Sequence, residues 1–365
     1  MLKLKGGYAF KSEKFQDSGV PVVRISNLPQ NSYSVDLSDC VYYECGNYQN
    51  YTVKNGDLLI AMSGATTGKT AIYRYDYPAY LNQRVGLFAP KELVHNQFLY
   101  PIVESKTFIS QLGSKLVAGA QPNISSQDIE TIAVGLPSKK EQIKIAHLFE
   151  LLNQKIETQS KIIEELTALR SALLEKVFQV SNPTLEVGAI VHQTSERNKL
   201  CRYSNVLSVS NRFGFINQSE QFEDRNVASD DVRNYKVVHR GDFAYNPARI
   251  NVGSIAMLKS FESGIVSPMY ICFQVDDTIV DPSFFELFLE TKAFKDEMEI
   301  RLEGSVRRCL SFEALCEIHL PRPALLVQRS ISDKIGNISS KIKLEDRILR
   351  AYIRQKEWLL KQMFI

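Results

Sequence analysis

The chain contains an internal duplication, and this feature limits the folds open to it more than any other. Identical residues recur at one constant offset through the first part of each copy, and they recur again beyond a one-residue insertion. The pairs are Gly56 with Gly241, Asp57 with Asp242, Gly68 with Gly253, Ala71 with Ala256, Phe88 with Phe273, Gln142 with Gln328 and Phe178 with Phe364. Two copies are too few for a solenoid, so we expect a pseudo-dimer within one chain.

The first part of each copy has the pattern of strands and turns. In the first copy, Gly56 and Asp57 precede the apolar run LLIAM (residues 58–62), and Tyr, Val, Ile and Phe are frequent around it. Such runs, bounded by turn residues, predict strands. Apolar residues spaced by three and four predict a short helix near residues 97–112 and another near residues 283–302.

The second part of each copy predicts a long helix. Ser138 and Glu141 have capping-box spacing after Pro137, and no Gly or Pro follows until the Ser-Asn-Pro stop at residues 181–183. Each helix would span about 55 Å. The predicted apolar seam consists of Leu148, Leu152, Ile162, Leu166, Leu169 and Leu173, widened by Ile156, Ile163 and Val177, with Ile342, Leu349, Tyr352 and Leu359 in the second helix.

These parts predict an α+β chain of two strand-rich mixed α/β domains joined by two long antiparallel helices, with a pseudo-two-fold repeat. The expected boundaries are residues 1–137 and 183–327 for the domains, and residues 138–182 and 328–365 for the helices. Because a whole domain lies between the helices, they can pair antiparallel as a coiled-coil spacer. Such a spacer would hold the two domains at a set distance.

Composition narrows the class of protein. Hydrophobic residues make up 44% and charged residues 23% of the chain, as in globular proteins. We expect a cytoplasmic protein without membrane contact, because no apolar run approaches about 20 residues and the start lacks a secretory signal. Six scattered cysteines are expected to be buried thiols. Cys309, Cys316 and His319 do not close a zinc site, so no metal is expected.

Two similar domains on a rigid spacer suit a ligand with two separated binding patches, such as a DNA duplex. The turn SGATTGKT (residues 63–70) corresponds to ARINVGSI (residues 248–255), so a shared frame carries unlike loops. This pattern predicts a bipartite, asymmetric DNA target. The net charge of +3 is too small for a non-specific nucleic-acid coat, so contacts would be local. A duplicated protein-interaction scaffold without DNA specificity is the alternative.

Two motifs resemble enzyme signatures without completing them. Gly68, Lys69 and Thr70 resemble the end of a phosphate-binding loop, but Ser63 stands where that loop needs its first Gly. A nucleotide-hydrolysing enzyme using Lys69 is therefore a third hypothesis, weaker than the first two. The NPAR segment (residues 246–249) lacks the second Pro and the aromatic residue of the amino-methyltransferase tetrapeptide. We expect no catalytic residue in this chain.

The candidate DNA-binding residues lie where the repeated frame is retained and the loops differ. Their side chains are of the types that recognise base edges and phosphates. For Arg307 and Arg308, pairing with neighbouring glutamates is an equal alternative. The candidates are Arg24, Asn27, Ser63, Thr66, Thr67, Lys69, Asn82, Gln83 and Arg84 in the first copy, and Asn211, Arg212, Asn246, Arg249, Asn251, Arg307 and Arg308 in the second.

Several segments, in this order, resemble type I restriction–modification specificity subunits. In the first copy they are GYAFKSEKF (residues 7–15), VPVVRISNL (20–28), GDLLIAMSGATTGKTAI (56–72) and NISSQDIETIAVGLP (123–137). LSVSN (207–211) and GDFAYNPARINVGSIA (241–256) resemble the other half more loosely. Family members usually carry a short segment before the first domain, like residues 184–188 before the second, whereas the first domain here starts almost at once.

The resemblance implies two target recognition domains and a helical spacer that docks two modification subunits. Those partners would carry S-adenosylmethionine and methylate adenine at N6, and restriction subunits would use ATP and Mg²⁺ to drive a nuclease. It implies that this chain binds double-stranded DNA and holds no cofactor of its own. The GYAFKS entry has no counterpart in the second copy, so the two domains are expected to belong to different subtypes.

Overall fold

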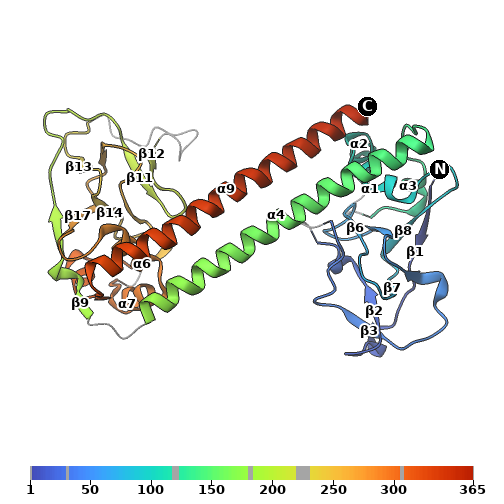
Figure 1. Ribbon diagram of the computed structural model, residues 1–365, viewed down its shortest axis with the longest axis horizontal. Coiled ribbons are helices and arrows are strands. Elements are labelled where there is room, and N and C mark those ends of the chain that lie inside the picture. The colour runs from blue at the N-terminus through green and yellow to red at the C-terminus, as the bar shows by residue number, and fades with distance from the viewer. Residues whose placement is uncertain are drawn as a thin grey trace. The chain divides into compact units, whose positions relative to one another are not determined.

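The structure of the protein is a computed structural model, which describes residues 2–29, 33–116, 123–179, 184–218, 231–304 and 308–364. The backbone divides into two compact units. Unit 1 contains Met1–Ile163 and Leu344–Ile365, and unit 2 contains Glu164–Lys343. Each unit therefore holds one domain and portions of both long helices (Figure 1). The chain mixes helices and strands, which confirms the predicted α+β class.

The described part of unit 1 forms two four-stranded sheets. Strand β5, inside the first sheet, is buried on both faces: Leu58 and Ile60 pack towards the helices, while Leu59 and Ala61 pack towards the second sheet. All pairs are antiparallel except β2 with β7. The first sheet has the order β1 (Leu2–Gly6), β8 (Val85–Pro90), β5 (Leu58–Ala61), β6 (Thr70–Ile72), and the second β3 (Val41–Tyr43), β2 (Val20–Val23), β7 (Ala79–Leu81), β4 (Thr52–Val53). The helices are α1 (Leu99–Glu104), α2 (Lys106–Leu116) and α3 (Ser126–Glu130).

In its described residues, unit 2 repeats the first sheet but not the second. Phe243 and Tyr245 of its buried strand β14 pack in the cluster with the helices, and Ala244 packs towards the outer strands. The sheet order is β10 (Val191–Thr194), β17 (Ile271–Val275), β14 (Phe243–Tyr245), β15 (Ile255–Met257), with helices α6 (Pro282–Glu290), α7 (Lys292–Arg301) and α8 (Phe312–Cys316). The outer pairs are β11 (Leu207–Ser210) with β12 (Gly214–Asn217) and β13 (Lys236–His239) with β16 (Ser263–Val266); β9 (Thr184–Glu186) pairs with β18 (His319–Pro321). The two domains thus share one layer and differ in the other. The candidate loops come from both layers, because residues 63–70 and 248–255 join strands of the shared sheet.

The repeated Gly-Asp pair makes the same turn in both units. The Asp57 carboxylate accepts a hydrogen bond from the Lys54 amide at 2.8 Å, and Asp242 accepts one from the His239 amide at 2.8 Å. The glycine before each aspartate has a positive φ, 87° in unit 1 and 94° in unit 2. Glycine adopts this conformation without steric cost, which accounts for its recurrence at the start of the central strand.

Each of the short helices predicted within the domains is in fact two helices. In unit 1 the break falls at Ser105, whose Oγ accepts a hydrogen bond from the Phe108 amide at 3.2 Å. In unit 2 it falls at Thr291, whose Oγ1 accepts one from the Phe294 amide at 3.1 Å. A capping hydroxyl competes with the continuous helical pattern, so apolar periodicity alone merged the two elements.

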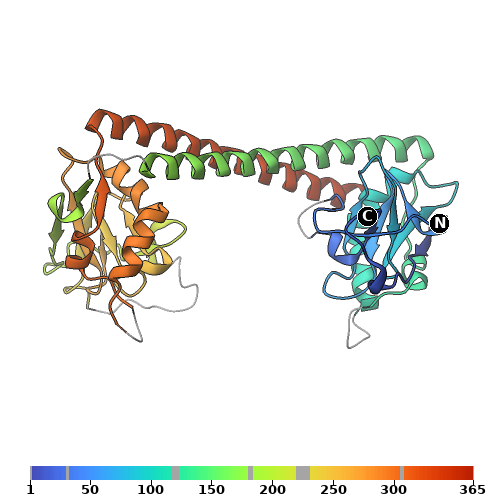
Figure 2. The same cartoon turned by 90° about the horizontal axis from the view of Figure 1, so that it is seen from below.

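The long helices are α4 (Lys139–Gln179) and α9 (Leu325–Met363), both continuous in Figure 2. The predicted capping box is confirmed: the Glu141 amide donates to Ser138 Oγ at 3.4 Å, and the Ser138 amide donates to the Glu141 carboxylate at 3.2 Å. The stop predicted at residues 181–183 lies outside the described residues. Among the described residues, no helix combines the length and apolar character that a bilayer crossing requires.

The buried face of α4 is not the predicted apolar seam. Leu152 is buried, but Leu148, Ile162, Leu169 and Leu173 are 36–49% exposed, and Leu166 is half-buried. A search for apolar residues overlooks polar side chains at buried positions, and a 3.5-residue repeat drifts around a straight helix. The buried side chains are Gln142, Ala146, Phe149, Leu152, Asn153, Ile156, Gln159, Leu174 and Phe178. The predicted residues of α9, Ile342, Leu349, Tyr352 and Leu359, are half-buried.

The two long helices run antiparallel within each unit, as predicted. In unit 1 the first part of α4 lies beside the last part of α9, where Lys155 Nζ is 5.5 Å from the Tyr352 ring centroid and the Gln159 amide donates to the Glu345 backbone carbonyl at 3.3 Å. In unit 2 the last part of α4 lies beside the first part of α9, and Arg170 Nε donates to Ser339 Oγ at 2.7 Å.

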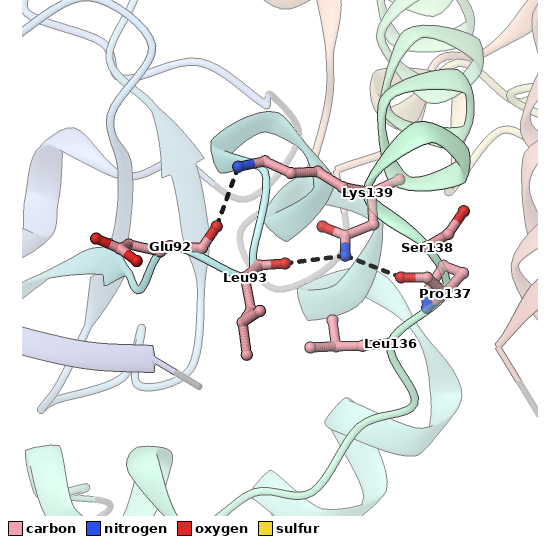
Figure 3. A pocket seen from close by; sticks show the side chains of 7 residues that line it. Glu92, Leu93, Leu136, Pro137, Ser138 and Lys139 are labelled. Atoms are coloured by element: carbon pink, nitrogen blue, oxygen red, sulfur yellow. Dashed lines mark hydrogen bonds between the residues drawn. The ribbon is translucent and has the colours of Figure 1, made fainter.

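Each long helix begins against its own domain through a buried glutamine. The Gln142 carbonyl oxygen accepts from the His95 amide at 2.8 Å. The Gln142 amide group donates to the Leu93 and Pro137 carbonyls at 3.1 and 3.0 Å, and Figure 3 marks these two bonds. In unit 2, Gln328 makes the corresponding contacts with Asp281, Ile279 and Pro323. The duplication therefore extends to individual hydrogen bonds.

Each long helix ends against the domain of the other copy. Phe178, near the end of α4, lies 4.8 Å from Phe284 between ring centroids in unit 2. Phe364, just past the end of α9, lies 5.8 Å from Phe98 in unit 1. Both pairs join equivalent positions of the repeat, so each unit is completed by a helix end from the other half of the chain.

Candidate nucleic-acid interface

In unit 1, the turns that carry the candidate residues lie together. The Met62 amide donates to the Arg84 carbonyl at 2.9 Å, which joins the turn after β5 to the turn after β7. The Asn82 amide donates to the Val23 carbonyl at 3.1 Å, which brings in the segment after β2. A Cβ at Gly64 would lie 3.4 Å from Ile25. Antiparallel and parallel pairing thus places loops distant in sequence at one edge.

The candidates of this edge differ in exposure. Gln83 and Arg84 are exposed, and Arg84 Nη1 lies 3.5 Å from the buried Ser63 Oγ. Asn82 is half-buried. Thr67 Oγ1 donates to the Gly64 carbonyl at 2.6 Å and so stabilises the turn itself. Gln83 and Arg84 therefore present side chains outward, whereas Ser63 and Thr67 hold the loop.

Thr66 and Lys69 carry buried polar groups without partners. Within the part of the chain that the structure describes, neither Thr66 Oγ1 nor Lys69 Nζ has a hydrogen-bond partner. Burying an unpaired ammonium group is costly, so a rearrangement that offers Lys69 an anion or water would be favourable. The equivalent of Lys69 in unit 2 is Ser254, whose Oγ donates to the Val209 carbonyl at 3.1 Å.

Arg24 and Asn27 serve the fold of the segment after β2. Asn27 is buried; its oxygen accepts from the Arg24 amide at 2.9 Å, and its nitrogen donates to the Asp36 carbonyl at 2.9 Å. The Arg24 guanidinium group lies 3.4 Å from the Asp39 carbonyl, and its Nε is buried without a partner. An inward-pointing Asn27 therefore has no free group with which to contact a base.

In unit 2, the candidates sit on the β11–β12 turn and on the β14–β15 connection, which touch. A Cβ at Gly253 would lie 3.4 Å from the Asn211 Cβ, so the two loops are in contact at this point. Asn246 Oδ1 accepts from the Ala248 amide at 3.1 Å, and its amide nitrogen lies 3.5 Å from Met269 Sδ. Asn246 therefore orders its loop, while Asn211 lies exposed beside it.

Arg249 and Asn251 are exposed, and the backbone of Arg249 closes the loop beneath them. Its amide donates to the Asn246 carbonyl at 2.9 Å, and its carbonyl accepts from the Ser254 amide at 3.2 Å. Among the described residues, no carboxylate pairs with the Arg249 guanidinium group. A held backbone with an unpaired cation above it is suited to bind a phosphate or a guanine edge.

Arg308 lies in a different environment. Its guanidinium group donates to the Glu299 carboxylate at 2.8 Å and to the Glu299 carbonyl at 2.7 Å. Of the two alternatives for this residue, the ion pair is the one present. Arg307 lies outside the described residues. Arg249 and Arg212 are therefore the candidate cations of unit 2 whose charge is available.

The segment that resembles the end of a phosphate-binding loop lacks the structure that such a loop requires. Lys69 and Thr70 lead into strand β6, whereas a phosphate-binding loop leads into a helix whose N-terminus holds the phosphates. Within the described ranges, no three His, Cys, Asp or Glu side chains gather in a way that could hold a metal ion. Cys309 and Cys316 are free, half-buried thiols.

Sequence reasoning missed several residues that the fold places at these edges. In unit 1, Asn123 is exposed and bridges to Ser63 through the backbone. In unit 2, Phe213 and Val252 are exposed on the candidate loops, and Met269 is exposed on the neighbouring β16–β17 connection. Two of these residues could have been found from their position in the sequence. Asn123 is the first residue of a motif that resembles the family, and Phe213 directly follows the candidate Arg212.

A cavity of about 710 Å³ in unit 1 lies at the start of α4 and shares no residue with the candidate interface. Glu92, Leu93 and Leu136 line it together with the first turn of the helix (Figure 3). Lys139 Nζ donates to the Glu92 carbonyl at 3.1 Å across it. The cavity therefore belongs to the junction between the domain and its helix.

Residues 1–168 match the family described as type I restriction modification DNA specificity domain. The match covers the first copy of the repeat and most of its long helix, so this part of the chain is similar to that family. The resemblance noted in the sequence is thereby confirmed. Among curated proteins, the chain is 27% identical over 180 residues to the MjaVIII specificity subunit of Methanocaldococcus jannaschii, covering 48% of this chain and 42% of that protein. It is 30% identical over 155 residues to the EcoAI specificity subunit of Escherichia coli, covering 40% of this chain and 26% of that protein.

The fold has a counterpart among solved structures. The S subunit of a type I restriction–modification system from M. genitalium superposes with a TM-score of 0.61 at 15% identity, covering 100% of this chain and 94% of that one. At this identity the likeness concerns the fold alone. The alignments with the two curated relatives span less than half of each relative's length.

Proposed function

We propose that this chain is the DNA sequence-recognition subunit of a type I restriction–modification complex and performs no chemistry itself. Each domain reads one half of a bipartite, asymmetric target in double-stranded DNA. The observation that carries this proposal is a repeated sheet bordered by loops that differ between the two units, with Arg84 exposed in unit 1 and Arg249 exposed in unit 2. A common frame with different side chains at its edge suits two different base sequences.

The long helices are proposed to dock two modification subunits. Support comes from the apolar side chains that the seam prediction placed inside and that lie exposed instead: Leu148, Leu169 and Leu173 on α4. Trp358 on α9 is 59% exposed. Apolar side chains that are exposed in the isolated chain become buried if a partner covers them, as in a protein interface. S-adenosylmethionine, ATP and Mg²⁺ are assigned to the partner subunits, and restriction subunits complete the nuclease.

The test is methylation mapping with the full-length chain co-produced with a type I modification subunit. We expect N6-methyladenine within one bipartite motif whose two half-sites differ. Arg249→Ala is expected to weaken binding of that motif by about 1–3 kcal/mol and to relax one position of one half-site, if the guanidinium group binds a guanine. An equal loss on all sequences would make Arg249 a phosphate contact.

The helices have a separate test. Deleting one helical turn from each long helix is expected to alter the permitted gap between half-sites and leave the half-sites unchanged. Altered half-sites with an unchanged gap would contradict the spacer role. Methylation without any sequence preference, together with retained binding of the modification subunit, would favour the protein-interaction scaffold.

A further inference from the structure

Phe213 occupies an unusual place for an aromatic side chain. It lies in the turn between β11 and β12 of unit 2, and it is 71% exposed. The strands on either side of the turn are hydrogen-bonded to each other, with Ser210 opposite Gly214. The turn therefore holds the Phe213 ring at the end of a paired hairpin. Full burial of such a ring contributes about 1.5–3 kcal/mol of favourable transfer free energy, and the isolated chain does not gain most of it.

The neighbouring residue supplies a cation to the same point. The Arg212 guanidinium carbon lies 5.6 Å from the centroid of the Phe213 ring, within the range of a cation–π contact. Among the described residues, no carboxylate pairs with Arg212, in contrast to Arg308 with Glu299 and Arg240 with Glu262. The turn therefore offers an aromatic face and an unneutralised positive charge together.

Two adjacent loops extend the apolar surface. The β11–β12 turn contacts the β14–β15 connection at Gly253, next to Val252, which is 57% exposed. Asn246 of the same connection contacts Met269, which is 62% exposed. Three neighbouring loops thus combine apolar side chains with the amide groups of the candidate interface.

We propose that Phe213 is a wedge that stacks against or between bases of the duplex at the half-site bound by unit 2, with Arg212 on the adjacent phosphate. This inference rests on the proposed function. An apolar side chain inserted between two neighbouring base pairs unstacks them, so binding favours DNA sequences that deform easily. Stacking of a base on an aromatic ring also contributes to the binding free energy. The unpaired arginines beside the apolar loops are complementary to a polyanion, which favours DNA over a neutral protein surface as the occupant.

The experiment selects bound duplexes from a random pool, using the full-length chain co-produced with a modification subunit. Wild type and Phe213→Ala are compared, and 2-aminopurine is then placed along the enriched half-sites. We expect Phe213→Ala to weaken binding of the wild-type motif about 10-fold. We also expect it to lose sequence preference in one half-site only and to abolish a fluorescence rise that wild type produces there.

Control variants separate stacking from folding. Phe213→Tyr keeps the ring and is expected to behave as the wild type. Leu200→Ala removes another apolar side chain of unit 2, 73% exposed, and is expected to change neither the motif nor the fluorescence. Hydrogen exchange of unit 2 should be unaltered in Phe213→Ala, because the side chain supports no core.

The outcomes distinguish this inference from the function on which it rests. If wild type and Phe213→Ala enrich the same bipartite motif with equal affinity, the wedge is overturned and DNA recognition stands. If Phe213→Ala instead loses the modification subunit while keeping its motif, the patch is a protein interface and the wedge is also overturned. If wild type enriches no motif, the proposed function fails, and the wedge fails with it.

Discussion

Units 1 and 2 each contain an ion pair between a long helix of one copy and the domain of the other copy. The two pairs occupy equivalent positions of the repeat but use different cations and differ in burial. In unit 1, Lys356 of α9 donates to Glu104 at the end of α1 at 2.7 Å, and the two side chains are 5% and 18% exposed. In unit 2, Arg170 of α4 pairs with Glu290 at the end of α6 at 2.8 Å, with 20% and 45% exposure. The positions are equivalent in the repeat, and the environments are not.

The difference arises from the layer that is not repeated. In unit 1, Tyr33 covers the pair, with Lys356 Nζ 3.6 Å from its ring centroid. Burial raises the pKa of Glu104 and lowers the pKa of Lys356, and each is partly offset by the charge of the other. Burial likewise raises the pKa of Tyr33 to about 12. The repeated layer thus determines which two residues form the ion pair. The segments that differ between the units determine how deeply the pair is buried, and therefore how much it contributes to stability.

The largest expected effect comes from breaking the two pairs in turn. Lys356→Ala should destabilise unit 1 by about 3–5 kcal/mol, because it leaves the Glu104 carboxylate buried without its partner. Arg170→Ala should cost about 1 kcal/mol or less in unit 2, because water reaches Glu290. Hydrogen exchange measured separately in each unit checks both values. Equal costs would show that burial does not decide the difference.

The pH dependence of the Lys356→Ala variant sharpens the same comparison. The folded-state pKa of Glu104 is raised, so the folded chain binds this proton more tightly than the unfolded chain. Its contribution to stability is therefore greatest at low pH and is lost as pH rises through the folded pKa. We expect the cost of Lys356→Ala to shrink as pH falls from neutral, in unfolding experiments referenced to wild type. A cost that grows on acidification would contradict the assignment.

The buried glutamines should show agreement where the ion pairs show difference. Gln142→Ala and Gln328→Ala each remove three hydrogen bonds and leave backbone groups unpaired at a helix start. We expect about 1–3 kcal/mol for each, in its own unit. Unit-resolved hydrogen exchange is the measurement. A marked difference between the two losses of stability would mean that equivalent hydrogen bonds contribute unequally, even though the repeat gives them the same geometry.

The smallest expected effects have opposite signs. Ser254→Ala should destabilise unit 2 by about 1 kcal/mol, because the Val209 carbonyl loses its donor. Lys69→Met should leave unit 1 as stable or slightly more stable, because it removes a buried ammonium without a partner, and it should weaken DNA binding. Thermal unfolding and gel shifts of both variants check this. A stability loss in Lys69→Met would assign Lys69 a structural role.

Much of the architecture could be predicted because its signals are local or repeated. The capping box at Ser138 and the continuous helix behind it follow from short-range pattern, and the duplication follows from identical residues at one offset. The predicted single helices failed at Ser105 and Thr291, where a side-chain hydroxyl interrupts an otherwise helical pattern. Asn27 could not be told from a surface amide, since its role depends on partners such as Asp36.

The amino-acid sequence by itself determined the repeat, the two long helices and the family resemblance, because identical spacing, periodicity and motif order are all contained in the linear chain. Only the tertiary structure decided which helix face is buried and which loops carry available charge. The physical reason is that burial is a property of partners: Gln142 is interior because Leu93 and Pro137 satisfy its amide, and Arg308 is neutralised because Glu299 folds beside it.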